Sequence, residues 1–176
     1  QNTVRDAVVA GINLNIFNRY AGRISMANIA QIVNVLQSVI LTNGPEMVKT
    51  PTYYVFKLYN VHHDARLIPV SLETETYTYK EESIPAITAS ASEKDGIVSM
   101  TLTNANPNKA VTIDCNLGNQ YKSVSGKIVT GKEMTAFNDF GKEEKVTVSE
   151  FMPGKIKNGV LKLEIPAFSV VLVQLQ

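Results

Sequence analysis

Hydrophobic and polar positions follow two different periods along the chain, and the period changes near residue 64. Before that point, apolar residues recur at close to helical spacing in two runs. Thr3 and Asp6 match the capping box that begins a helix, and the second run opens with the Thr-Pro pair that suits a helix start. The pattern therefore predicts helices over 3–20 and 51–62.

The stretch between these two runs has a different pattern. Ile24 to Leu36 is rich in β-branched and small residues, and the near-continuous apolar run in its first half suits a strand buried on both faces, as in a parallel sheet. A helix over Ile32 to Leu41 is the alternative that the pattern leaves open. Asn43-Gly44-Pro45 then predicts a turn. The N-terminal third is expected to be helix, strand, helix.

Beyond residue 64 the period falls to two, which is typical of strands with one buried face. Asp95-Gly96 and Asn158-Gly159 are dipeptides that suit tight hairpin turns. About nine such runs predict a two-sheet antiparallel sandwich. The expected strands are 66–72, 84–91, 97–103, 110–117, 121–129, 133–138, 145–149, 160–165 and 168–175. The expected core includes Val98, Met100, Leu102, Ile113, Cys115, Leu161, Leu163, Val170 and Leu172.

Composition excludes several classes of protein. The 176 residues hold 44% hydrophobic and 19% charged residues with a net charge of +1, so no charge excess points to nucleic acid or to a membrane surface. A single cysteine excludes an internal disulfide and any multi-cysteine zinc site. Polar residues interrupt the longest apolar stretch, so no transmembrane segment is expected. A soluble protein of the cytoplasm, periplasm or exterior fits, and the sequence does not choose between them.

Several chemistry-bearing residues have a structural interpretation that outweighs the functional one. His62-His63-Asp64 could suggest a metal or acid/base cluster, but adjacent residues on a helix point in different directions, so a helix C-terminus that favours partly charged histidines is expected. Cys115 lies on the apolar side of an alternating strand and should be an inert, buried thiol. The glutamates lie in polar strand or loop contexts and are expected to be solvated: Glu73, Glu75, Glu81, Glu82, Glu143 and Glu144.

Gln31, with its neighbours Asn28 and Asn34, is the remaining candidate. A polar amide inside a buried parallel strand is costly unless it is paired, and polar residues at the carboxyl end of a barrel strand commonly face a ligand. The residues alone favour a satisfied core amide over a ligand-binding one.

Several separated motifs, in order, closely resemble the C-terminal part of the α-L-arabinofuranosidases of glycoside hydrolase family 51. They span essentially the whole chain. The motifs are Arg5-Asp6-Ala7, Leu14–Phe17, Ala27–Val35, Ile40–Thr42, Thr50–Phe56, Asn138-Asp139-Phe140, Phe151 and Ile165–Leu172.

This resemblance implies a (β/α)8 catalytic barrel followed by a jelly-roll-like, all-β antiparallel sandwich. Residues 1–63 would then be the last βα unit of the barrel with a preceding helix, and residues 64–176 would be the sandwich. The family's two catalytic glutamates lie on earlier barrel strands, so no catalytic residue is expected in this chain. The family's strand-eight glutamine, which hydrogen-bonds the arabinose ring in the −1 subsite, matches Gln31, and this favours substrate binding at that position. Asn28 and Asn34 remain structural.

The resemblance implies that the parent protein is an exo-acting, retaining glycosidase, a hydrolase that removes terminal arabinofuranosyl groups from arabinan or arabinoxylan oligosaccharides. It implies no cofactor, no metal, no nucleic-acid partner and a homo-oligomer. The chain alone should be inactive. The alternative is a non-catalytic sandwich module for carbohydrate binding or oligomerisation; the absence of tryptophan argues against sugar stacking. Residues 3–62 are expected to pack against the sandwich and a second copy, or to be poorly ordered.

Overall fold

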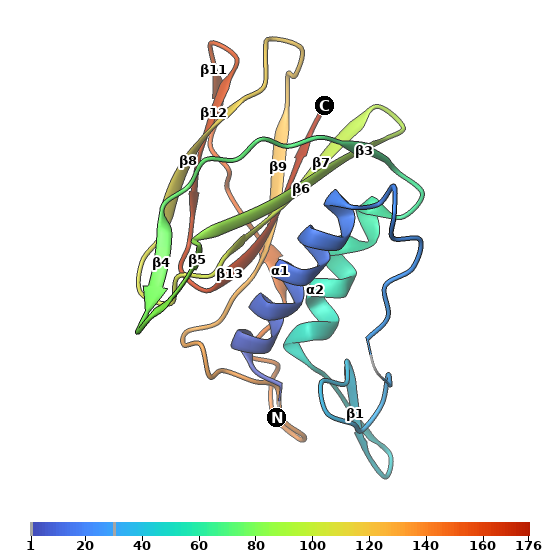
Figure 1. Cartoon of the computed structure of the whole chain (residues 1–176). Coiled ribbons are helices and arrows are strands. Elements are labelled where there is room, and N and C mark those ends of the chain that lie inside the picture. Colours follow the sequence, from blue (N-terminus) through green and yellow to red (C-terminus); the bar gives the residue numbers. More distant parts are fainter. Residues whose placement is uncertain (1, 30) are drawn as a thin grey trace.

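The computed structural model describes residues 2–29 and 31–176, and it shows a β-sandwich with two helices packed against one of its sheets (Figure 1). The helices are α1 (Val4–Arg19) and α2 (Pro51–Tyr59), the latter continued by a 3-10 turn η1 (Asn60–His62). The strands are β1 (Ile40–Asn43), β2 (Glu46–Lys49), β3 (Arg66–Ile68), β4 (Thr76–Tyr79), β5 (Glu82–Pro85), β6 (Ile87–Lys94), β7 (Ile97–Asn104), β8 (Val111–Asn116), β9 (Val124–Val129), β10 (Val148–Glu150), β11 (Ile156–Lys157), β12 (Val160–Ile165) and β13 (Ser169–Leu175).

Two antiparallel sheets form the sandwich, as the period-two pattern predicts. One has six strands in the order β10-β9-β13-β7-β6-β3, and the other has three in the order β11-β12-β8. The two expected hairpin turns are present, with positive φ at Asp95 and Gly96 and at Asn158 and Gly159. The expected strand over 133–138 is wrong, because this stretch is irregular and belongs to the loop between β9 and β10. Two short hairpins, β1–β2 and β4–β5, were not expected from the pattern.

The core between the two sheets contains most of the predicted residues. Val98, Leu102, Ile113, Leu161 and Leu163 are buried there, and Met100 and Cys115 pack against them half-buried. Val170 and Leu172 are a correction, because they are buried on the other face of β13. On β13 it is Val171, Val173 and Leu175 that face the second sheet.

The expected helices are confirmed. The Thr3 amide and hydroxyl both donate to Asp6 Oδ2, at 2.7 and 2.8 Å, at the start of α1. Thr50 precedes α2 with an extended backbone, as expected of an N-cap, but its hydroxyl donates to the carbonyls of Ser38 and Val39. None of the helices among the described residues is long and apolar enough to cross a membrane.

The two helices lie side by side on the six-stranded sheet and form a second core there (Figure 1). Strand β7 is consequently buried on both faces: Thr101 and Thr103 are fully buried under α1. The prediction of a single buried face on this strand is therefore wrong, because helices cover the polar side. Gly11 marks how closely α1 approaches, since a Cβ there would lie 2.5 Å from Thr103 Oγ1.

The stretch of 24–36 that joins the first helix to the β1–β2 hairpin, here called the linking segment, is not the strand that its composition predicts. Residues 24–29 and 31–36 are irregular, and only Val33 forms a bridge, parallel to Ile40. The alternative helix over 32–41 is absent as well. Met26 and Leu36 are 74% and 86% exposed. A strand requires a partner for its backbone groups, and the described residues place no strand alongside this segment beyond the single bridge.

Candidate functional site

Gln31, the predicted substrate-binding residue, lies on the exposed surface of the linking segment. Its side chain makes no hydrogen bond to the described residues. The residues that follow are tied to β1, because the Ile40 amide donates to the Ile32 carbonyl and the Asn34 amide donates to the Ile40 carbonyl, both at 3.1 Å. Gln31 is therefore an exposed amide next to an anchored piece of backbone, and it is not a satisfied core amide in this chain.

Side chains reinforce this anchor at the surface. Asn34 Oδ1 accepts from the Thr42 amide at 2.7 Å, and Asn34 Nδ2 donates to the Thr42 hydroxyl at 2.8 Å and to its carbonyl at 3.2 Å. Further along, Gln37 Nε2 donates to Asp6 Oδ1 at 3.1 Å. Asn34 thus has the structural role expected of it, whereas Asn28 is simply exposed.

Ser38, two residues after the linking segment, is fixed to the starts of both helices by buried polar contacts. Asn2 Nδ2 donates to the Ser38 carbonyl at 2.5 Å, and the Thr50 hydroxyl donates to the same carbonyl at 3.1 Å. The Thr50 amide also donates to Val39 O at 3.0 Å. Because Ser38 and Thr50 are buried, these bonds hold the base of the loop against the helix pair.

A polar network lies between the helices and the six-stranded sheet, and only its polar residue types mark it in the sequence. Its centre is Asn15 on α1, which is fully buried. Asn15 Oδ1 accepts from the hydroxyls of Tyr59, Ser90 and Thr101 at 2.8–2.9 Å. Asn15 Nδ2 donates to the carbonyl and hydroxyl of Thr88 and to the hydroxyl of Thr103 at 3.1–3.3 Å. Every polar atom of this amide is therefore paired, which makes the network a means of fixing α1 on the sheet.

His62 extends this network and is not the partly charged histidine that its sequence position predicts. Its Nδ1 lies 2.7 Å from Ser92 Oγ, and its Nε2 lies 2.9 Å from Thr101 Oγ1. The Thr101 hydroxyl already donates to Asn15, so it accepts from Nε2–H, and Ser92 donates to Nδ1. Burial lowers the pKa of His62 to about 4, so the ring is neutral at pH 7.

The other residues singled out from the sequence are structural. Burial, with the carboxylate of Asp114 as a smaller cause, raises the pKa of the half-buried Cys115 thiol to about 11, which makes it unreactive at neutral pH. His63 and Asp64 form an exposed pair 3.2 Å apart. Within residues 2–29 and 31–176, no group of three or more His, Cys, Asp or Glu side chains could hold a metal ion.

All six predicted solvated glutamates are exposed, although two of them have partners. Glu75 pairs with Lys109 at 2.8 Å, and Glu144 accepts a hydrogen bond from the Tyr54 hydroxyl. This last contact, together with Asn138, whose Nδ2 donates to Lys49 O at 2.9 Å, ties the loop between β9 and β10 to β2 and α2. The loop between β9 and β10 therefore helps to hold α2 and β2 in place.

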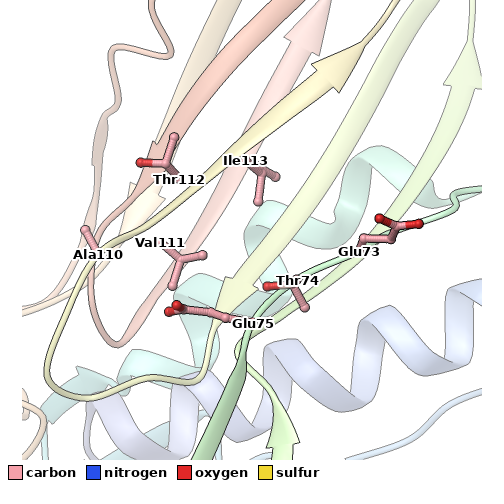
Figure 2. Close-up of a pocket in the computed structure, with 7 residues that line it drawn as sticks. All are labelled: Glu73, Thr74, Glu75, Ala110, Val111, Thr112 and Ile113. Carbon is pink, nitrogen blue, oxygen red and sulfur yellow. The ribbon is translucent and has the colours of Figure 1, made fainter.

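Two hollows lie on the sandwich itself. One, of about 430 Å³, separates Glu73, Thr74 and Glu75 from residues 110–113 at the edge of β8 (Figure 2). Of the two carboxylates that line this hollow, that of Glu75 forms an ion pair with Lys109. The other, of about 840 Å³, lies between the two sheets beside Cys115 and is lined mainly by core side chains. Glu73 lines both hollows, together with Glu75 in the smaller one and with Asp114 in the larger one.

The chain is thus a helix-backed antiparallel sandwich preceded by an anchored segment with an exposed glutamine. The chain belongs to the α-L-arabinofuranosidase C-terminal domain family, whose model matches residues 1–169. This confirms the family that the motifs indicated, glycoside hydrolase family 51.

Relatives of this chain are longer proteins. It is 45% identical to an intracellular exo-α-L-arabinofuranosidase of Bacteroides ovatus over 100% of this chain and 35% of that protein. It matches the crystal structure of the GH51 arabinofuranosidase of Xanthomonas axonopodis pv. citri with a TM-score of 0.96 and 39% identity, over 100% of this chain and 36% of that one. The GH51 enzyme of Thermotoga petrophila matches with a TM-score of 0.86 at 21% identity, over 99% and 39%, which shows a shared fold. The chain thus spans about a third of the length of the relatives it matches.

Proposed function

We propose that this chain is the C-terminal segment of an exo-acting, retaining α-L-arabinofuranosidase that removes terminal arabinofuranosyl groups from arabinan or arabinoxylan oligosaccharides. The observation that carries the proposal is its 45% identity, along its whole length, to a Bacteroides ovatus protein named as an exo-α-L-arabinofuranosidase. The catalytic acid/base and nucleophile, two glutamates in this reaction type, would come from another part of the longer protein.

The proposal divides the chain into two parts with different roles. Residues 1–63 would complete a (β/α)8 barrel, and residues 64–176 would form the sandwich that supports it. The exposure of apolar side chains on the linking segment supports this division, because Met26 and Leu36 lack cover within the described residues. A barrel strand beside this segment would cover such side chains and satisfy its backbone.

Gln31 would bind the arabinofuranosyl ring in the −1 subsite of this enzyme. Its exposed amide supports this role, since one side-chain carbonyl and one NH2 group can accept from and donate to sugar hydroxyls. The bonds between residues 32–34 and β1 hold the neighbouring backbone in place. A binding residue needs such support to keep its geometry through the reaction.

The first experiment compares the chain alone with the longer protein on an aryl α-L-arabinofuranoside. We expect turnover by the longer protein and none above background by the purified chain. Turnover by the chain, after removal of trace longer enzyme, would contradict the placement of both catalytic glutamates elsewhere.

The second experiment changes Gln31→Ala in the longer protein. Hydrogen bonds that tighten at the transition state contribute about 1 to 4 kcal/mol, so kcat/KM should fall roughly tenfold to several hundredfold while the melting temperature is unchanged. Gln120→Ala, at an exposed glutamine on the sandwich, is the matched control and should retain full activity. An unchanged kcat/KM in Gln31→Ala would remove Gln31 from the substrate site.

A role in oligomerisation is compatible with this function, and exposed apolar residues of α1 and of its C-cap favour it. Val9 and Ile16 on α1 and Tyr20 directly after it are 52%, 41% and 55% exposed, and apolar side chains such as these can supply an interface. We propose a homo-oligomer of the longer protein. Light scattering at several concentrations tests this, and a strictly monomeric protein would contradict it.

A further inference from the structure

We infer that Asn34 is a positioning residue for Gln31, acting through its three hydrogen bonds to Thr42. This inference rests on the proposed role of Gln31 in binding the arabinofuranosyl ring. The set of bonds between these two residues is called the Asn34–Thr42 clamp below. It joins the linking segment, three residues after Gln31, to the second-last residue of β1.

The backbone of Asn34 explains why an asparagine occupies this position. Its φ is +56°, a left-handed conformation that most side chains disfavour and that asparagine tolerates. In this conformation its amide both accepts from the Thr42 N–H and donates to the Thr42 hydroxyl and carbonyl. An amide with a donor and an acceptor can match these groups together, whereas a carboxylate or an alkyl chain cannot.

The clamp lies where it can control Gln31 without being needed for the fold. Residues 32–34 and Ile40 share only two backbone hydrogen bonds, so the path from Gln31 to β1 depends on few contacts. Asn34 and Thr42 are both exposed and lie outside both hydrophobic cores. Exposed hydrogen bonds contribute little to the stability of a whole domain but can fix a local conformation.

The segment on the other side of the clamp is paired in the β1–β2 hairpin, which gives the clamp a base. Thr42 pairs with Met47 in the β1–β2 hairpin, and β2 leads directly into α2 through Thr50. The buried contacts of Ser38 with Asn2 and Thr50 fix the other end of the loop. Loss of the clamp would therefore free the stretch around Gln31 and leave the hairpin and helices in place.

The test is a double-mutant cycle on kcat/KM in the longer protein with an aryl α-L-arabinofuranoside. Asn34→Gly keeps the left-handed backbone and removes all three bonds, so kcat/KM should fall roughly three- to tenfold, mainly through kcat, with an unchanged melting temperature. Asn34→Asp keeps the acceptor for the Thr42 amide and should recover part of the loss. Asn158→Gly is the matched control, because Asn158 is exposed, has a φ of +51° and lies in the β11–β12 turn.

The decisive comparison is Asn34→Gly in the Gln31→Ala background, where no further loss is expected because Asn34 acts through Gln31. An equal loss in both backgrounds would overturn the inference, as would full activity of Asn34→Gly while Gln31→Ala is impaired. Full activity of Gln31→Ala would instead show that the proposed role of Gln31 has failed. A lower melting temperature of Asn34→Gly, together with its loss of activity, would make the role of Asn34 structural and would also overturn the inference.

Discussion

The two helices and the linking segment between them are all apolar enough to need cover, but they differ in what they find in this chain. α1 and α2 bury their apolar sides on the six-stranded sheet, in a core that includes Val4, Val55 and Val170. The linking segment lies outside that core, with Met26 and Leu36 exposed. The linking segment lies between the two helices in sequence, so position along the chain does not explain why only the helices are covered.

The difference follows from where each element finds its backbone hydrogen bonds. A helix satisfies its own N–H and C=O groups, so it needs only a surface that accepts its side chains. A strand needs neighbouring strands to pair its backbone N–H and C=O groups. Within residues 24–29 and 31–36, the linking segment has a single bridge, from Val33 to Ile40. The comparison shows that helices can dock on a sheet by their side chains alone, whereas a segment that needs strand partners stays irregular without them.

The largest effect of removing a polar side chain is expected at the centre of the helical layer. Asn15→Ala would leave the hydroxyls of Ser90 and Thr101 without their shared acceptor in a buried site, which should lower the free energy of unfolding by about 2 to 4 kcal/mol. Asn13→Ala on the exposed side of the same helix is the control and should change it by less than about 0.5 kcal/mol. Urea unfolding measures both. Equal values would show that the network does not fix the helices.

A somewhat smaller effect is expected from pH at His62. Burial lowers its pKa from 6.5 to about 4, so the unfolded chain binds the proton more readily than the folded one. The contribution of His62 to the free energy of unfolding is therefore fully present above pH 6.5. It is lost as the pH falls from 6.5 to 4, by about 2 to 3 kcal/mol. His62→Gln should flatten that part of the stability profile.

The neighbouring His63 supplies the control for this measurement. Its side chain is exposed and pairs only with Asp64 at the surface. His63→Gln should leave the pH dependence between 4 and 6.5 unchanged. A profile that responds equally to both substitutions would contradict the neutral, buried state of His62.

The smallest effect is expected in the linking segment. Leu36→Ala should change the free energy of unfolding of this chain by less than about 0.5 kcal/mol, because Leu36 is 86% exposed. Leu58→Ala makes the same change at a leucine of α2 that is 3% exposed and should cost about 2 to 5 kcal/mol. A cost at Leu36 close to that at Leu58 would mean that the linking segment is packed in this chain.

The sequence predicts an element well where its conformation depends on residues close by in the chain. It predicts poorly which side of an element is buried, because that depends on parts of the chain that are distant in sequence. The helices over 3–20 and 51–62 and the Asp-Gly and Asn-Gly turns depend on local chemistry, and the structure has them in place. The inward face of β13 depends on what covers each side. Because α1 and α2 cover one side and β12 and β8 the other, alternation could not assign Val170 and Leu172.

The candidate site shows the same division. Gln31 was found through a motif resemblance, since nothing local distinguishes a ligand-binding amide from a core amide. The network around Asn15 was missed because serine and threonine on alternate strand positions ordinarily indicate a solvated face. The Asn34–Thr42 clamp was missed because its two residues meet only after the chain turns at Leu36 and Gln37 and enters β1.

Amide hydrogen exchange of the linking segment, measured in this chain and in the longer protein, tests the central claim most directly. The account predicts fast exchange across residues 24–29 in the chain alone, beside slow exchange in β7 and β13, whose residues are buried on both faces. In the longer protein, the same amides should exchange as slowly as those of the sandwich. Slow exchange of residues 24–29 in the chain alone, or fast exchange of them in the longer protein, would contradict the proposal that these residues form a barrel strand there.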